Sequence, residues 1–248
     1  MKQVAIITGG GQGIGAATAL LAAQRGYAVC VNYFQNHTTA NSVVSKIQES
    51  GGEAIAVQAD VSVSTDVDQL FQTVDAQLGR LTALVNNAGI LEQQMKVEAM
   101  SLDRWQRVFA TNVFGSFLCA QAAVQRMSTQ QGGSGGAIVN VSSLAARAGS
   151  PGEYVDYAAS KGALDTFTIG LSKEVAEEGI RVNAVRPGFI DTAMHASGGE
   201  PNRIERVKGQ VPLKRGGTAE EVANAILWLL SGEASYTTGG FIDIAGGR

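Results

Sequence analysis

Short apolar runs alternate with longer amphipathic segments along nearly the whole of this 248-residue sequence. The runs have the length of buried strands, and the segments between them carry the periodicity of helices. Parallel strands need such long crossover connections, and the connecting helices then cover the sheet. We therefore predict an α/β fold, with one domain built on a doubly wound parallel sheet of about seven strands and helices on both faces.

The predicted strands and helices follow one another in regular order. The strands are expected at 4–7, 28–32, 54–58, 83–85, 137–141, 181–185 and 241–244. The helices are expected at 14–25, 38–50, 65–78, 102–128, 155–178 and 219–231. The glycine-rich stretch 130–136 is interpreted as a turn, because the alternation continues beyond it, and we expect a single domain over 1–248.

Composition argues against several classes of function. A net charge of −3 offers no basic surface for nucleic acid. No uninterrupted apolar stretch approaches the roughly 18 residues of a membrane span, so we expect a cytoplasmic protein with no membrane partner. Cys30 and Cys119 lie in apolar segments and are expected to be buried free thiols. His37 and His195 lack partners at metal-ligand spacing, so no metal site is predicted.

A glycine-rich turn follows the first predicted strand directly. It is Thr8-Gly-Gly-Gly-Gln-Gly-Ile-Gly15 and leads into a helical run. Glycines let the backbone approach a phosphate closely, and a helix start offers unpaired N–H groups and the positive end of its dipole. This position between strand and helix favours a pyrophosphate site over an ordinary tight turn.

Polar residues also follow the third and fourth predicted strands. Asp60 closes one, and Asn86-Asn87-Ala88-Gly89 closes the other. Ligands bind at the carboxyl ends of strands in open α/β sheets, so these residues are candidates to meet an adenine and a ribose. A helix cap for Asp60 and a turn for the asparagine pair are the alternatives.

Tyr157 and Lys161 lie four residues apart in a predicted helix, which places a phenol and an ammonium on one face. A nearby cation favours the phenolate and would lower the tyrosine pKa, so that the phenol could exchange protons with a substrate. Such pairs also occur on solvated helix faces, so the surrounding motifs decide what this pair means.

Together these motifs resemble the short-chain dehydrogenase/reductase family, in its form of about the length of this chain. The resemblance spans essentially the whole sequence. It is carried by Thr8-Gly-x3-Gly13-x-Gly15, Asp60-Val61, Asn86-Asn87-Ala88-Gly89, Asn112 in Thr-Asn-Val-Phe-Gly, Ser143, Tyr157-x3-Lys161, and Arg186-Pro187-Gly188 followed by Thr192. It implies a Rossmann-like fold and hydride transfer between a nicotinamide cofactor and a carbonyl or alcohol.

The resemblance implies roles for individual residues. Tyr157 would donate a proton to the carbonyl oxygen during reduction and remove it during oxidation, and Ser143 would hold that oxygen. Lys161 would lower the pKa of Tyr157 and bind the nicotinamide ribose, and Asn112 would keep a water linking Lys161 to solvent. The residues implied to bind the cofactor are Gly9, Gln12, Gly13, Ile14, Gly15, Tyr33, Asp60, Val61, Asn87, Ala88, Gly89, Tyr157, Lys161, Pro187, Gly188, Ile190 and Thr192.

The chain departs from the family in the loop before Tyr157. Relatives usually have thirteen positions from the serine to the tyrosine, whereas Tyr157 is fourteen positions after Ser143, so we place one extra residue within 149–156. Ser142 and Ser150 are weaker candidates for the substrate serine. Tyr154 and Asp156 lie near the expected substrate mouth, although capping of the next helix is the favoured interpretation for them.

The end of the second predicted strand bears on which nicotinamide is used. NAD-dependent relatives usually carry a carboxylate there, which binds the ribose 2′-OH and repels a 2′-phosphate. The equivalent position is Tyr33, and the stretch 32–37 contains neither a carboxylate nor an arginine. We predict NADP(H), with NAD(H) as the open alternative.

The segment at about 189–210 corresponds to the substrate lid of the family, and a lone loop histidine such as His195 is more often solvated than bound to substrate. The resemblance fits 3-oxoacyl carrier-protein reductases, sugar dehydrogenases and broad carbonyl reductases about equally. It also implies a homotetramer built from the helices at 102–128 and 155–178 and the C-terminal strand.

The rival hypothesis is a catalytically silent protein of the same fold that senses or regulates through a bound dinucleotide. Such a protein is expected to lack the proton-transfer residues, whereas this chain has all of them. We therefore predict an enzyme, an NAD(P)(H)-dependent oxidoreductase that acts on a small-molecule carbonyl or secondary alcohol.

Overall fold

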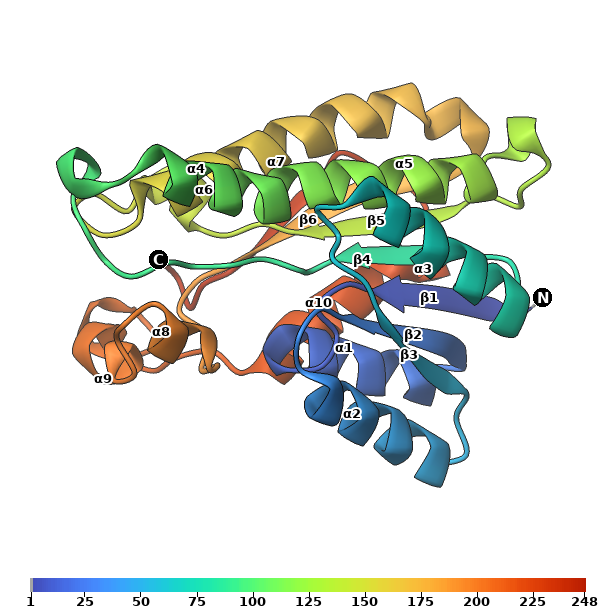
Figure 1. Cartoon of the computed structure of the whole chain (residues 1–248), viewed down its shortest axis with the longest axis horizontal. Coiled ribbons are helices and arrows are strands. Elements are labelled where there is room, and N and C mark those ends of the chain that lie inside the picture. The colour runs from blue at the N-terminus through green and yellow to red at the C-terminus, as the bar shows by residue number, and fades with distance from the viewer. Residues whose placement is uncertain (1) are drawn as a thin grey trace.

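The computed structural model describes residues 2–248, and across them the chain forms seven strands in one sheet. The strands lie in the order β3-β2-β1-β4-β5-β6-β7, and every neighbouring pair is parallel (Figure 1). Their bounds are β1 Gln3–Ile7, β2 Tyr27–Tyr33, β3 Ala54–Gln58, β4 Ala83–Asn86, β5 Gly136–Val141, β6 Ile180–Pro187 and β7 Phe241–Ile244. This confirms the predicted doubly wound parallel sheet.

Helices cover both faces of the sheet, as predicted (Figure 1). One face is covered by α1 (Gly13–Gln24), α2 (His37–Glu49) and α10 (Ala219–Leu230). The other is covered by α3 (Ser64–Gln77), α5 (Gly115–Met127) and α7 (Val155–Glu174).

Alternate strand residues serve the two cores, because successive side chains of a strand point to opposite faces. Ile7 lies in the first core and Ile6 in the second, and both are fully buried. Each such side chain contributes roughly 1.5–3 kcal/mol on burial. Cys30 and Cys119 are buried free thiols of the second core, as predicted.

The helices differ from the prediction at several places. The helix expected at 102–128 is interrupted by a π-helical turn, Ala110–Phe114, between α4 (Leu102–Phe109) and α5. The helix expected at 155–178 ends as an α-helix at Glu174. Three further short α-helices occur within residues 2–248, and four or five residues are too few to show a periodic pattern. They are α6 (Ala145–Ala148), α8 (Met194–Ser197) and α9 (Arg203–Val207).

The stretch Leu102–Met127 is long and apolar enough to cross a membrane by length and composition alone, but half of its most apolar window is buried inside this fold. Residues of α5 supply part of the second core, including Cys119, Ala123 and Met127. The apolar character of this helix therefore has a structural explanation in packing against the sheet.

The carboxyl ends of the strands meet at one edge of the sheet. Figure 1 shows this edge next to the short helices α8 and α9. The winding of the sheet reverses between β1 and β4, so the segments that follow these two strands diverge to opposite faces. A crevice forms at such a reversal, and it is the usual ligand position in this class of fold.

Candidate active site

The turn between β1 and α1 has room only for glycine at its tightest points. Gly9 and Gly13 have φ angles of +60° and +52°, in the left-handed region. A Cβ on Gly15 would lie 2.4 Å from the carbonyl oxygen of Gly9 and 2.6 Å from Nδ2 of Asn87. Within residues 2–248 no side chain caps the first turn of α1, so its N–H groups are available to an anion.

Thr8 and Asn87 brace this turn against the end of β4. The Thr8 hydroxyl accepts hydrogen bonds from the backbone N–H groups of Asn87 and Ala88, both at 2.9 Å. The Asn87 side-chain amide donates to the carbonyl oxygens of Thr8 at 2.8 Å and Gly9 at 3.1 Å. Asn87 thus fixes the glycine turn by its hydrogen bonds, and it also lines the cavity that contains Tyr157.

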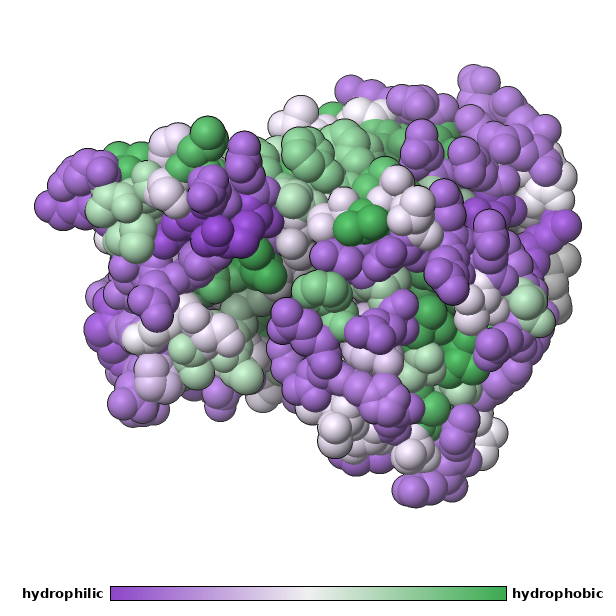
Figure 2. Space-filling view, in the orientation of Figure 1, coloured by the Kyte–Doolittle hydropathy of each residue, from purple (hydrophilic) through white to green (hydrophobic). Residues whose placement is uncertain are grey.

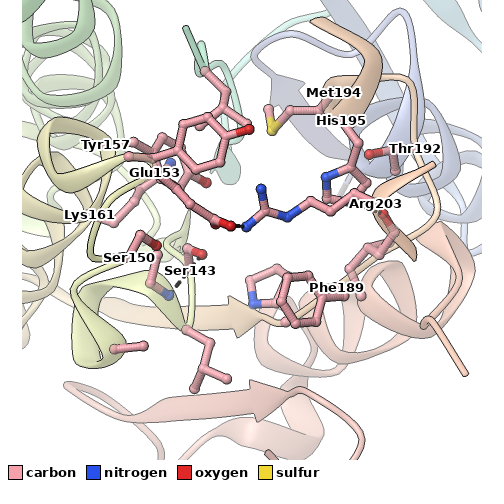
Figure 3. Close-up of a pocket in the computed structure, with 18 of the residues that line it drawn as sticks. Ser143, Ser150, Glu153, Tyr157, Lys161, Phe189, Thr192, Met194, His195 and Arg203 are labelled. Carbon is pink, nitrogen blue, oxygen red and sulfur yellow. Dashed lines mark hydrogen bonds and ion pairs between the residues drawn. The ribbon is translucent and has the colours of Figure 1, made fainter. Parts of the chain in front are cut away.

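Tyr157, Lys161 and Ser143 line one cavity at this edge (Figure 3). The first two lie on successive turns of α7, and Ser143 follows β5. The Lys161 side chain is buried, and its Nζ donates to the carbonyl oxygen of Val141 at 2.8 Å. Ser142 is also buried, and its hydroxyl donates to the Lys161 carbonyl oxygen at 3.3 Å.

The pKa values of the tyrosine and the lysine shift in opposite directions. Burial raises the pKa of Tyr157, and the Ser143 hydroxyl lowers it in part. Burial lowers the pKa of Lys161 to about 8, while the Asp165 carboxylate raises it. From the sequence, Lys161 is expected to lower the tyrosine pKa, but here the lysine ammonium bonds a carbonyl and lies 5.6 Å from the centre of the Tyr157 ring.

Asn112 lies in the π-helical turn and is fully buried. Its Oδ1 accepts from the Ile90 N–H at 2.8 Å, and its Nδ2 donates to the Ile90 carbonyl at 3.1 Å and to Oγ of Ser160 at 3.0 Å. A Cβ on Gly89 would lie 3.3 Å from Oδ1 of Asn112 and 3.5 Å from Nζ of Lys161. The side chain therefore ties the loop after β4 to α7, directly beside the lysine.

The segment after β6 brings further predicted cofactor residues to the same place. Pro187, Gly188, Ile190 and Thr192 line the cavity that contains Tyr157. Thr192 faces the glycine turn, since a Cβ on Gly13 would lie 3.3 Å from the Thr192 methyl carbon. The structure thus joins the two ends of the predicted cofactor motif across the sheet edge.

Tyr33, Asp60 and Val61 do not line this cavity. Tyr33 closes β2, and its ring contacts His37 edge to face with 5.7 Å between centroids. Oδ1 of Asp60 accepts hydrogen bonds from the backbone N–H and hydroxyl of Ser62 at 2.9 and 2.7 Å. These contacts form a turn before α3 and not the helix cap considered as the alternative, because no side chain of residues 2–248 caps that helix.

The cavity has a volume of about 470 Å³ and a largely apolar wall. Figure 3 shows Arg203 reaching across it from the segment 189–210 to Glu153. Arg203 and Arg206 each pair with both Glu153 and Glu200, and we call these four side chains the Glu153 bridge. The bridge could not be predicted from the sequence. Glu153 and Arg203 are 50 positions apart, and the sequence shows their charges but not their proximity.

Neither Tyr154 nor Asp156 caps α7, which corrects the interpretation favoured from sequence. The Tyr154 hydroxyl donates to the Gly198 carbonyl at 3.0 Å, and Asp156 forms a buried ion pair with Arg104. Both side chains are drawn away from the helix start by partners that lie far away in the sequence.

The loop in which the sequence predicts an extra residue forms a tight turn. Gly149, Ser150 and Gly152 have positive φ angles of 76°, 45° and 76°.

His195, in the facing segment, is partly buried and its Nε2 lies 2.9 Å from the Ile190 carbonyl oxygen, so it is not the solvated residue expected from sequence. Burial lowers the pKa of this histidine.

Comparison with known proteins agrees with this geometry. Residues 9–248 match the family model described as enoyl-(acyl carrier protein) reductase. The chain is 61% identical to the uncharacterized oxidoreductase YgfF of Escherichia coli (strain K12), over 99% of both proteins. It is 43% identical to a 3-oxoacyl-[acyl-carrier-protein] reductase of Synechocystis, over 99% of this chain and 96% of the relative.

A solved dehydrogenase/reductase from Sinorhizobium meliloti 1021 has the same fold, with a TM-score of 0.91 and 31% identity over 99% of this chain and 94% of that one. Sequence and fold agree with these proteins over essentially the full length. This chain therefore belongs to the short-chain dehydrogenase/reductase family and is an oxidoreductase that acts on alcohol or carbonyl groups.

Proposed function

We propose that this protein reduces a carbonyl to a secondary alcohol, or the reverse, with Tyr157 as the general acid and base. The observation that carries the proposal is that Ser143, Tyr157 and Lys161 line one cavity. Two hydroxyl groups in one cavity can bind one substrate oxygen, and the phenol can exchange a proton with it.

The residues present fit a nicotinamide dinucleotide. The Gly15 position excludes any side chain, and the uncapped start of α1 lies next to Thr192, so this edge suits a pyrophosphate. When bound, the cofactor would supply or accept the hydride. Gly9, Gly13 and Thr192 would contact its phosphates, and Lys161, Asn87 and Ile190 would hold its nicotinamide half.

Lys161 and Asn112 complete the proposed proton path. A pKa of about 8 leaves the Lys161 ammonium mostly protonated at pH 7, so it can return a proton toward Tyr157 after each reduction. Asn112 would hold the water that links this lysine to solvent. Its two bonds to Ile90 fix the loop on which that water would rest.

A 3-oxoacyl thioester is the favoured substrate class, ahead of sugars and simple ketones. The Synechocystis relative carries the name of a 3-oxoacyl-[acyl-carrier-protein] reductase. The cavity wall includes Leu144, Phe189 and Met194, which suit an acyl chain better than a sugar. The paired hydroxyl groups of Ser143 and Tyr157 suit a carbonyl oxygen, whereas an enoyl substrate presents a carbon–carbon double bond to be reduced.

A substrate screen followed by cofactor absorbance tests this proposal. The panel contains a 3-oxoacyl thioester, the matching trans-2-enoyl thioester, ketones, sugars and secondary alcohols. We expect the highest kcat/KM with the 3-oxoacyl thioester. Turnover of the enoyl thioester alone would overturn the carbonyl assignment, and no turnover of any compound would favour a dinucleotide-sensing protein.

We propose NADP(H) as the preferred cofactor, because Tyr33 at the end of β2 leaves no carboxylate to repel a 2′-phosphate. Tyr33→Asp should lower kcat/KM for NADPH by about tenfold or more through charge repulsion, with a smaller effect for NADH. Steady-state kinetics with both cofactors measure this. A tenfold preference of the wild-type protein for NADH would contradict the assignment.

We also propose a homotetramer whose interface includes α5 and α7. Phe114, Phe117 and Ile169 are 59%, 41% and 42% exposed, and Phe117 stacks on Phe167 with 3.7 Å between ring centroids. Figure 2 shows apolar side chains gathered on the surface above α5. Such a patch marks an interaction surface.

Phe117→Glu is expected to shift the protein toward smaller assemblies in size-exclusion chromatography with light scattering, because each interface would bury an unpaired charge. Val63→Glu, at an exposed apolar residue before α3, is the control and should leave the mass unchanged. A monomeric wild-type protein would contradict the proposal. We likewise propose a single domain over 1–248, a substrate lid at about 189–210 and a cytoplasmic location.

A further inference from the structure

Asp156 directly precedes Tyr157, yet its side chain takes no part in the cavity. It forms an ion pair with Arg104 of α4, with the Asp156 and Arg104 side chains only 2% and 5% exposed. Nε of Arg104 donates to Oδ2 at 2.6 Å and Nη2 donates to Oδ1 at 3.2 Å. The guanidinium therefore grips both carboxylate oxygens in the forked geometry that only arginine offers.

The remaining guanidinium nitrogen of Arg104, Nη1, bonds to another segment of the site. It donates to the carbonyl oxygen of Gln93 at 2.6 Å, in the loop after β4. A backbone bond joins this loop to the residues before α7, because the Met95 N–H donates to the Glu153 carbonyl at 3.1 Å. One buried guanidinium thus connects α4, the loop after β4 and the first turn of α7.

The start of α7 is fixed by contacts with other segments and not by a side-chain cap of its own. No side chain within residues 2–248 caps this helix, and the residues before it form the loop that carries the extra position. Tyr157 lies in this first turn, so its hydroxyl moves with any change in the helix start. Burying two charges costs several kcal/mol of desolvation, so the pair is not explained by a simple gain in stability.

We propose that Arg104 and Asp156 form a positioning pair, which sets the start of α7 so that the Tyr157 hydroxyl meets the substrate oxygen. This inference rests on the proposed role of Tyr157. The pair also fixes the loop that carries Leu91, a residue of the cavity wall, relative to the tyrosine. The two residues touch neither substrate nor cofactor and act through the elements that they join.

Three single variants and one double variant test the pair, with the best substrate from the screen. Arg104→Met and Asp156→Asn should each lower kcat by about 10- to 100-fold, because a displacement of about 1 Å can cost a factor of 100. Binding of NADPH, followed by its fluorescence, should stay within about twofold. Arg104→Lys keeps the charge but not the fork, and should lower kcat by an intermediate factor.

The double variant Arg104→Met/Asp156→Leu separates positioning from stability. It leaves no unpaired buried charge, so its melting temperature should return toward that of the wild type, while kcat should stay low. Arg107→Met is the matched control on the same helix, because Arg107 is 57% exposed in its ion pair with Glu92. This control should keep the wild-type kcat.

A double variant that regains both melting temperature and kcat would overturn the inference, since the pair would then be structural only. Failure of the single variants to fold leaves the double variant and Arg104→Lys as the deciding measurements. Full activity of Tyr157→Phe would instead overturn the proposed function. The two failures are therefore distinguishable.

Discussion

Tyr157→Phe is expected to lower kcat by about 1,000-fold, because the substrate oxygen would lose its proposed proton donor and general acid catalysis contributes roughly 10²- to 10⁴-fold. The substitution removes one oxygen and keeps the ring, so the packing against Lys161 should survive. NADPH affinity should change by less than about twofold, since the phenol oxygen acts mainly on the reacting substrate. Steady-state kinetics and fluorescence titration measure the two quantities.

Tyr154→Phe provides the matched control. Tyr154 also lines the cavity, but its hydroxyl donates to the Gly198 carbonyl in the proposed lid. Its loss should raise KM more than it lowers kcat, because it removes one bond of the proposed lid and no proton donor. Equal losses of kcat in the two variants would show that lid closure, and not proton transfer, limits both.

Lys161→Met is expected to lower kcat/KM by about 100-fold or more, because it removes the ammonium that we propose binds the nicotinamide half of the cofactor and returns the proton. The same change should alter how stability depends on pH. The buried lysine has a pKa of about 8, whereas an unfolded lysine has the ordinary value of 10.5. Between these values the unfolded chain binds more protons, so the wild-type protein should gain stability as pH rises from 8 toward 10.5.

The full gain amounts to about 3 kcal/mol, since each pKa unit is worth roughly 1.4 kcal/mol. Urea unfolding of the cofactor-free protein at pH 7.5, 9 and 10 measures it as a difference between wild type and Lys161→Met, which cancels the titration of other groups. Lys173→Met, at an exposed lysine of the same helix, should retain the wild-type pH dependence. If the free energies of unfolding of the wild type and Lys161→Met changed in parallel with pH, the lowered pKa of Lys161 would be contradicted.

The sheet could be predicted because its cause is local in the sequence. Each strand is a short apolar run, and fully buried positions such as Ile6 and Ile7 leave that signal on both faces. The glycine turn was visible for a similar reason, since Gly9, Gly13 and Gly15 are dictated by backbone conformation and space within one segment.

The cavity wall could not be predicted, because its contacts join distant segments. Arg104 and Asp156 are 52 positions apart, and Glu153 and Arg203 are 50 apart. Nothing in the local pattern around Arg104, between an acidic residue and a tryptophan, distinguishes it from a solvated helix position. The favoured cap for Asp156 was wrong for the same reason, since a buried arginine from another helix competes better for the carboxylate.

The π-helical turn at Ala110–Phe114 has a consequence for how this protein can evolve. Such a turn accommodates one more residue than an α-helix of the same length, so a single deletion there would restore a regular helix. A regular helix at this place would disrupt the packing, because the removal of one residue rotates α4 by about 100° relative to α5. Arg104 would then leave Asp156, or Met127 would leave the core, with almost no change in helix content. Length changes in descendants should therefore gather in loops such as 149–156, and this stretch should keep its residue count even where its sequence drifts.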